Sequence, residues 1–173
     1  VLTASRTDTH ITENLSVSAQ FALNQYTLTY TAGTGGTITG TVTQTVSHGS
    51  DGTEVTAVAS EGYHFVQWSD GVLTASRTDT HITENLSVSA QFALNQYTLT
   101  YTAGTGGTIT GTVTQTVSHG SDGTEVTAVA SEGYHFVQWS DGVLTASRTD
   151  THITGNLSVS AQFALNQYTL TYT

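Results

Sequence analysis

An internal repeat of 71 residues constrains this chain more than any other feature. The segment 1–71 recurs unchanged as 72–142, and the sequence starts again at Val143. The copies differ at one position, where Glu13 and Glu84 are replaced by Gly155. A fixed period of this kind indicates a tandem array of one structural unit, so the 173 residues hold about two and a half copies.

Within the unit, apolar and polar residues alternate with a period of two, and helical periodicity is missing. We expect strands over 15–23, 26–31, 55–59 and 63–68, and weaker strands over 9–12, 37–39 and 42–47. The run 63–68 is apolar on both faces, which predicts that it is the most buried strand. Glycine-rich turns separate these runs. The pattern predicts an all-β fold, a tandem array of small β-sheet modules with a period of 71 residues.

Six aromatic residues supply most of the apolar area that each unit can bury. A module of this size is marginally stable alone, so contact with its neighbours should matter. The expected core and junction residues are Phe21, Asn24, Gln25, Tyr26, Tyr30, Tyr63, Phe65, Trp68, Phe92, Tyr97, Tyr101, Tyr134, Phe136 and Trp139.

The connection between units is very short. Only Asn24 and Gln25 separate Leu23 from Tyr26, and no Pro-, Gly- or Ser-rich linker is present. The apolar phase changes from odd to even positions there, which indicates a bend or a one-residue bulge. We therefore expect a stiff connection and a rod, with 15–31 as its mechanical link.

Charge and composition exclude several classes of protein. Each unit carries one Arg and six Asp or Glu, a net charge of −5, and the chain totals −10 without any lysine. So few cations cannot neutralise a nucleic-acid backbone, and no apolar run is long enough to insert into a membrane. Ser and Thr make up 22 of the 71 residues, a composition typical of secreted proteins. We expect an extracellular location, on the cell surface or in an extracellular filament.

The stretch 52–71, GTEVTAVASEGYHFVQWSDG, and the closing run 86–92, LSVSAQF, resemble the divergent internalin B-type repeat of secreted bacterial surface proteins. This family is also called the bacterial repeat domain. The resemblance covers the whole unit and departs from the family at Ala59 and Ala130, where a proline often stands. It implies small β-sheet modules, which can be β-grasp-like. Their expected bounds are 26–96 and 97–167, with the C-terminal part of a module at 1–25 and the first strand of the next at 168–173.

Candidate chemistry in the unit is weak. Ser47, His48, Ser50 and Asp51 have the residue types of a hydrolytic triad, but a triad needs them to converge from separate elements. The histidines lack ligand spacing, and a calcium site would need oxygens from adjacent modules to converge. We predict no catalytic site, no cofactor and no metal site. Trp68 is either a core residue or a sugar-stacking platform.

Three asparagines begin Asn-Leu-Ser sequons, which are glycosylation sites only in a source with the matching machinery. They are Asn14, Asn85 and Asn156.

These features favour a structural, non-catalytic extracellular protein that forms a rod-like stalk or filament. Its expected partner is itself, through adjacent repeats and neighbouring chains. The alternative is an adhesin repeat that binds a glycan or a host-surface protein by avidity.

Overall fold

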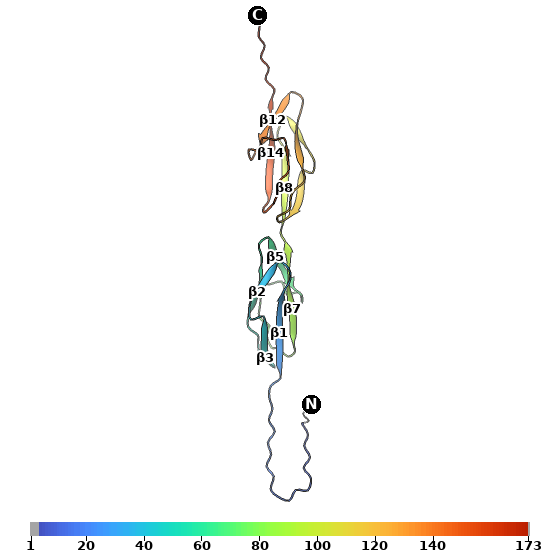
Figure 1. Ribbon diagram of the computed structural model, residues 1–173, viewed down its shortest axis with the longest axis vertical. Helices are drawn as coiled ribbons and strands as arrows, with labels where there is room; N and C mark the ends of the chain where they lie inside the picture. Colours follow the sequence, from blue (N-terminus) through green and yellow to red (C-terminus); the bar gives the residue numbers. More distant parts are fainter. Residues whose placement is uncertain (1–3, 173) are drawn as a thin grey trace.

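The computed structural model describes residues 4–172 and contains two β-modules that lie end to end along one long axis (Figure 1). The first module holds β1 (Gln25–Ala32), β2 (Gly36–Gly40), β3 (Thr43–Ser47), β4 (Val55–Ala59), β5 (Tyr63–Trp68), β6 (Ser76–Arg77) and β7 (Leu86–Leu94). The second holds β8 (Gln96–Ala103), β9 (Gly107–Thr110), β10 (Thr114–Ser118), β11 (Val126–Ala130), β12 (Tyr134–Trp139), β13 (Ser147–Arg148) and β14 (Leu157–Leu165). The all-β fold class and the tandem arrangement are confirmed.

Each module consists of two small sheets. In the first module the strand orders are β3-β1-β7-β5 and β2-β4-β6, and the second module repeats both orders. Every pair is antiparallel except β1 with β7, and β8 with β14, which are parallel. The first and last strands of a module therefore run side by side in the same direction, at the centre of the larger sheet.

The core lies between the two sheets, because the inward residues of each alternating strand are apolar. In the first module the core consists of Leu28, Tyr30, Val55, Ala57, Trp68, Ile82, Val88 and Ala90. Trp68 is completely buried, and its indole nitrogen donates to the Thr74 carbonyl at 3.1 Å. The second module has the same core at positions 71 residues later.

Aromatic rings cover the glycine-rich turn between β1 and β2. A Cβ at Gly36 would lie 2.2 Å from the Phe92 ring, and one at Gly35 would lie 2.2 Å from the Tyr63 ring. Phe92 in turn meets Phe65 edge to face, with the ring centroids 6.0 Å apart. These glycines are needed because two rings pack directly against the backbone.

The partial copies at the two ends form no strands among the described residues. Phe21, an expected packing residue, is 90 % exposed, whereas its copies Phe92 and Phe163 pack against the two cores. The strand 15–23 is absent because the strands that flank its copies, β1 and β5, come earlier in the chain than β7. Residues 168–172 likewise lack the later strands that pair with β1, and Val1–Thr3 and Thr173 lie outside the described part.

Two other expectations differ from the structure. The run 63–68 is not the most buried, because β5 is an edge strand with a bulge between Phe65 and Gln67 and an exposed Val66. No strand forms over 9–12 or its copies. Instead the two-residue strand β6 pairs with β4 just before that stretch.

Candidate functional site: the junction between modules

The two modules are joined by a single residue. β7 ends at Leu94 and β8 begins at Gln96, so only Asn95 lies between them. Figure 1 shows that the chain leaves the first module and enters the second along the same line. This follows from the parallel central pair, because a module is entered at one end of β1 and left at the opposite end of β7.

The backbone of Asn95 is bound to both modules. Its N–H donates to the Gly62 carbonyl of the first module at 2.8 Å, and its carbonyl accepts from the His119 N–H of the second at 2.8 Å. With both polar groups of this one residue held, few backbone torsions remain free at the connection.

Side chains extend this contact. The Asn95 Oδ1 lies 2.9 Å from His64 Nδ1, within the first module's end. The His119 ring of the second module lies against the backbone of Gly62, where a Cβ would be only 2.3 Å from its Cδ2 atom. His119 Nδ1 also lies 3.4 Å from the Tyr97 hydroxyl, which holds the ring over the junction.

The same end surface exists without a following module. Asn166 N–H donates to the Gly133 carbonyl at 2.8 Å, and Asn166 Oδ1 lies 3.0 Å from His135 Nδ1. The φ angles of Gly62 and Gly133 are 77° and 78°. Yet Gly133 is exposed and has no other described atom near its Cβ position, whereas Gly62 is buried. The end surface is therefore formed before docking, which lowers the entropic cost of the contact.

The structure places the residues expected at the junction and in the core in different parts of the modules. Tyr97 and Asn95 lie at the junction. Asn24 occupies the equivalent place directly before β1, where its carbonyl accepts from the His48 N–H at 2.8 Å, and Gln25 is the first residue of β1. Leu94 is 41 % exposed and its copy Leu165 is 62 % exposed, so the second module covers part of this side chain. Most of the other predicted residues belong to or pack against the two cores: Tyr26, Tyr30, Phe65, Trp68, Phe92, Tyr101, Phe136 and Trp139. Tyr63 and Tyr134 instead pack on the backbone of Gly35 and Gly106 in the turns.

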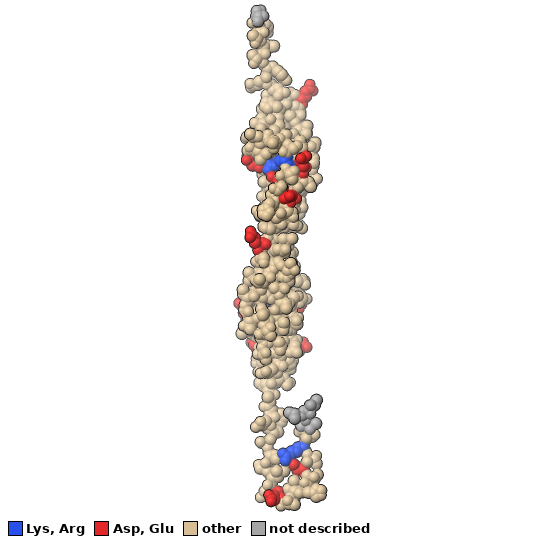
Figure 2. Space-filling model, in the orientation of Figure 1, with Lys and Arg blue, Asp and Glu red and all other residues tan. Residues whose placement is uncertain are grey.

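A buried arginine cluster stabilises each module. Arg77 forms two hydrogen bonds to Asp70, at 2.9 and 2.8 Å, and two to Asp79, at 3.0 and 2.6 Å. Its guanidinium carbon lies 5.1 Å from the Trp68 ring centroid, and the Tyr30 hydroxyl donates to Asp79 at 2.7 Å. The second module repeats the cluster around Arg148. In Figure 2 charged atoms form small isolated patches on a surface that is otherwise uncharged.

The cluster shifts the ionisation of its members. Hydrogen bonds from Arg77 lower the pKa of Asp70 below its usual value. Burial, followed by the hydrogen bond to Asp79, raises the pKa of Tyr30. Burial opposes the charge of Arg77, but its bonds to Asp70 and Asp79 outweigh burial and raise its pKa. All three shifts keep the native charge state across the neutral range.

Sequence reasoning did not identify this cluster. The available signal was the position of the only cation in each unit, seven residues after one aspartate and two before another. In a chain with few cations, an arginine between two aspartates is a strong candidate for a buried ion pair.

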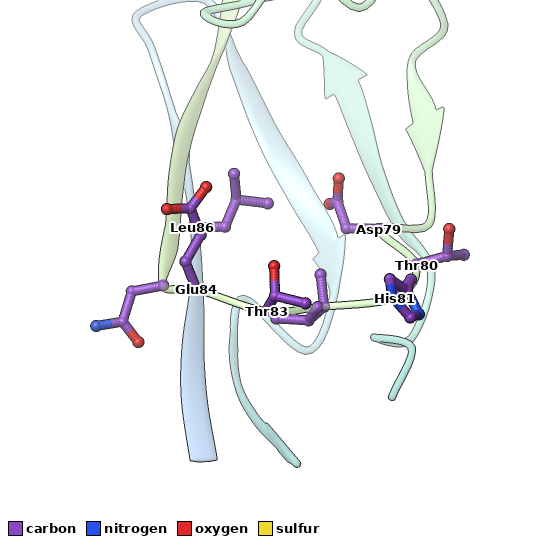
Figure 3. A pocket seen from close by; sticks show the side chains of 8 residues that line it. Asp79, Thr80, His81, Thr83, Glu84 and Leu86 are labelled. Carbon is purple, nitrogen blue, oxygen red and sulfur yellow. The ribbon is translucent and has the colours of Figure 1, made fainter. Parts of the chain in front are cut away.

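A shallow pocket of about 200 Å³ lies at the end of the first module where β1 begins. Figure 3 shows its lining, which comes from the loop between β6 and β7 together with the first residue of β7, and includes Asp79, Thr83, Glu84 and Leu86. Ligand pockets usually occupy 300–1,000 Å³ and gather residues from several elements. The Asp79 carboxylate in its lining is already paired with Arg77, so it is not free to bind a ligand in this pocket.

The triad-like residues form a turn after β3. The Ser50 N–H donates to the Ser47 carbonyl at 3.0 Å, and Asp51 Oδ1 accepts from the His81 N–H at 2.7 Å. His48 Nδ1 lies 3.3 Å from the Tyr26 hydroxyl. Among the described residues no three His, Cys, Asp or Glu side chains gather as a metal site would require. No helix in that part of the chain is long and apolar enough to span a bilayer.

Two of the sequon asparagines hold strands in place. Asn85 Oδ1 accepts from the Thr27 N–H at 2.8 Å, and Asn156 Oδ1 accepts from the Thr98 N–H at 2.9 Å. Asn14 lies in the extended segment before β1 and is exposed. The indole of Trp68 is enclosed by the core and is not accessible as a sugar platform.

Comparison with known proteins gives one family. The model of the divergent InlB B-repeat domain matches residues 26–96 and 97–167. A protein of Evansella cellulosilytica named "Putative membrane protein" is 27 % identical over 169 residues, covering 94 % of this chain and 24 % of that protein. Internalin H of Listeria monocytogenes is 32 % identical over 121 residues, covering 65 % of this chain and 21 % of that protein. The chain thus spans a quarter or less of these relatives. No solved structure matches significantly.

Proposed function

Because the chain belongs to the divergent InlB B-repeat domain family, we propose that it forms part of a rod-like stalk or filament outside the cell. The family match confirms the resemblance expected from the sequence. The chain's similarity to an internalin supports the location outside the cell in this proposal. In this proposal the modules do no chemistry. They extend the protein and hold whatever stands at its end away from the cell surface.

One observation carries the proposal, namely that Asn95 is hydrogen-bonded to both modules at once. A connection with both of its backbone groups bound cannot act as a free hinge. The copies are identical at the contacting positions, so each junction applies the same rotation and rise. Repetition of one such operation generates a straight or gently helical rod.

The test is small-angle scattering of the whole chain and of two matched glycine variants. Gly62→Ala places a methyl group against the His119 ring, 2.3 Å from its nearest atom, and should force the modules apart. Gly133→Ala places a methyl group on a turn with the same positive φ and open space around it. Both variants carry the same backbone strain, about 1–2 kcal/mol for a side chain at this φ, so a difference between them reports the junction alone.

We expect the unmodified chain and Gly133→Ala to give one extended particle of fixed length. Gly62→Ala should give a broader range of lengths while its modules stay folded by circular dichroism. Scattering from freely swivelling modules in the unmodified chain would refute the rod.

A second candidate is an adhesin repeat, which one feature favours. The outer face of the larger sheet carries Thr27, Thr45 and Ser87 with no charged side chain on its strands, and this face recurs once per module. Such a row of hydroxyl groups could bind a glycan weakly at each copy and tightly by avidity. Glycan-array binding by the whole chain, lost when Thr27 and Thr45 and their copies are replaced by valine, would favour this reading.

A further inference from the structure

The central parallel pair, β1 with β7, is placed where a stretching force would act. We propose that this pair is the force-bearing element of each module and that it resists tension by shear. The inference rests on the proposed stalk function, because a stalk is loaded through its two ends. Beyond the stalk function, the proposal identifies the strand pair that carries the tension inside each module.

The direction of the load follows from the topology. The chain enters the module at the start of β1 and leaves it at the end of β7. The two strands are parallel neighbours, so tension pulls them in opposite directions along their own axes. Five residue pairs, from Leu28 with Leu86 to Ala32 with Ala90, must then slip together rather than one after another. An antiparallel pair pulled from its open end would separate one pair at a time.

Hydrogen bonds close the pair at both ends. At its start the Asn85 side chain accepts from the Thr27 N–H at 2.8 Å. At its end the Gly33 N–H donates to the Ala90 carbonyl at 2.9 Å. The first bond lies just before the five residue pairs, and the second joins the last paired residue of β7 to the residue after β1, so slippage of the pair must break both bonds too.

The pair is also shielded from water on its inner face and along its two edges. Its inward side chains Leu28, Tyr30, Val88 and Ala90 are at most 4 % exposed, and β3 and β5 cover its two edges. Water therefore reaches the interstrand hydrogen bonds only from the outer face of the sheet, which hinders their replacement while the strands stay in place. A pair at the edge of a sheet would lack this protection.

The second module has the same arrangement. Asn156 accepts from the Thr98 N–H at 2.9 Å, and Gly104 donates to the Ala161 carbonyl at 2.8 Å. Modules in series carry equal tension, so equal resistance in each leaves no weak link. The chain has no cysteine or lysine, so neither disulfides nor lysine isopeptide bonds can carry the load.

Optical-tweezer measurements on the whole chain can compare two directions of pulling. The absence of native cysteines allows DNA handles to be attached at introduced ones. Gln25→Cys with Gln96→Cys loads the first module by shear. Gln25→Cys with Glu84→Cys pulls the starts of β1 and β7 apart, because both sites lie at the same end of the pair. Glu84 is suitable because Gly155 replaces it in another copy.

We expect the rupture force in the shear geometry to be several-fold higher than in the second geometry. Equal forces, or a lower force in shear, would overturn the proposal. With the shear handles in place, Asn85→Ala should lower the force, while the matched Asn156→Ala in the unloaded module should not. The two proposals fail separately. Equal rupture forces would refute the shear mechanism but not the rod-like stalk, whereas freely swivelling modules in scattering would refute the stalk but not the shear mechanism.

Discussion

Replacing Arg77 with alanine should destabilise the first module and leave the second unchanged. The side chain is buried, and its four hydrogen bonds go to two carboxylates. Its removal leaves Asp70 and Asp79 facing each other without a counter-ion. The two modules are identical between 26–83 and 97–154, so the second serves as an internal reference.

The expected loss follows from the environment of the cluster. Removing one partner of a buried ion pair usually costs about 3–5 kcal/mol, and loss of the cation–π contact with Trp68 falls within that figure. The Asp70 and Asp79 side chains are 35 % and 17 % exposed, so water recovers part of the cost. We therefore expect the low end of the range, about 3 kcal/mol for the first module.

Thermal unfolding of the whole chain by calorimetry measures this loss. For a module of 60–100 residues about 1 kcal/mol corresponds to 4–8 °C, so the first module should melt roughly 12–24 °C below the second. A single transition should become two. Arg6→Ala is the control, because the Arg6 pair with Asp8 is 55 % and 34 % exposed and should contribute less than about 1 kcal/mol.

If Arg77→Ala lowers the stability of the first module by less than about 1 kcal/mol, the reasoning is refuted, because that is the contribution of an exposed ion pair. Arg77→Met combined with Asp79→Asn provides a further check. It keeps much of the buried volume and removes one unpaired charge, so it should recover part of the lost stability.

Two other predictions concern stability. Because the folded Asp70 and Asp141 have lowered pKa values, the unfolded chain takes up protons first as the pH falls, so the melting temperature should decline below about pH 4. The pKa of Tyr30 is raised in the folded chain, so the unfolded chain loses this proton first and stability should also fall above about pH 10. A melting temperature that stays flat from pH 3 to 11 would contradict both the acid and the alkaline prediction. Gln44→Ala should cost roughly 2–3 kcal/mol in urea unfolding, because the buried amide binds the Thr53 N–H and the carbonyls of Thr41 and Thr53, whereas the exposed Gln91→Ala should be nearly neutral.

Local patterns predicted much of the fold. The alternation over 26–31 and 55–59 identifies β1 and β4, because one face of each strand meets the core and the other meets water. The repeat period correctly indicated a tandem array. Alternation describes a strand and its faces, but it contains no information about which strand lies beside which.

Long-range features therefore escaped prediction. The parallel pairing of β1 with β7 joins residues 58 positions apart, and it decides that β5 is an edge strand in spite of its apolar sequence. The short connection at Asn95 was visible, but the docking of His119 on Gly62 was not, because it depends on where two turns meet. The arginine cluster likewise needs Trp68 and Tyr30 brought together by folding.

The end surface at Gly133 has the same conformation as the one that is covered at Gly62. The atoms that meet at a junction come from adjacent copies of the same repeated block, so a gene that gains or loses a whole block creates no mismatched interface. Unequal recombination between such copies would change only the reach of the protein. We therefore expect that adding or removing whole repeats leaves every junction intact, without any compensating mutation.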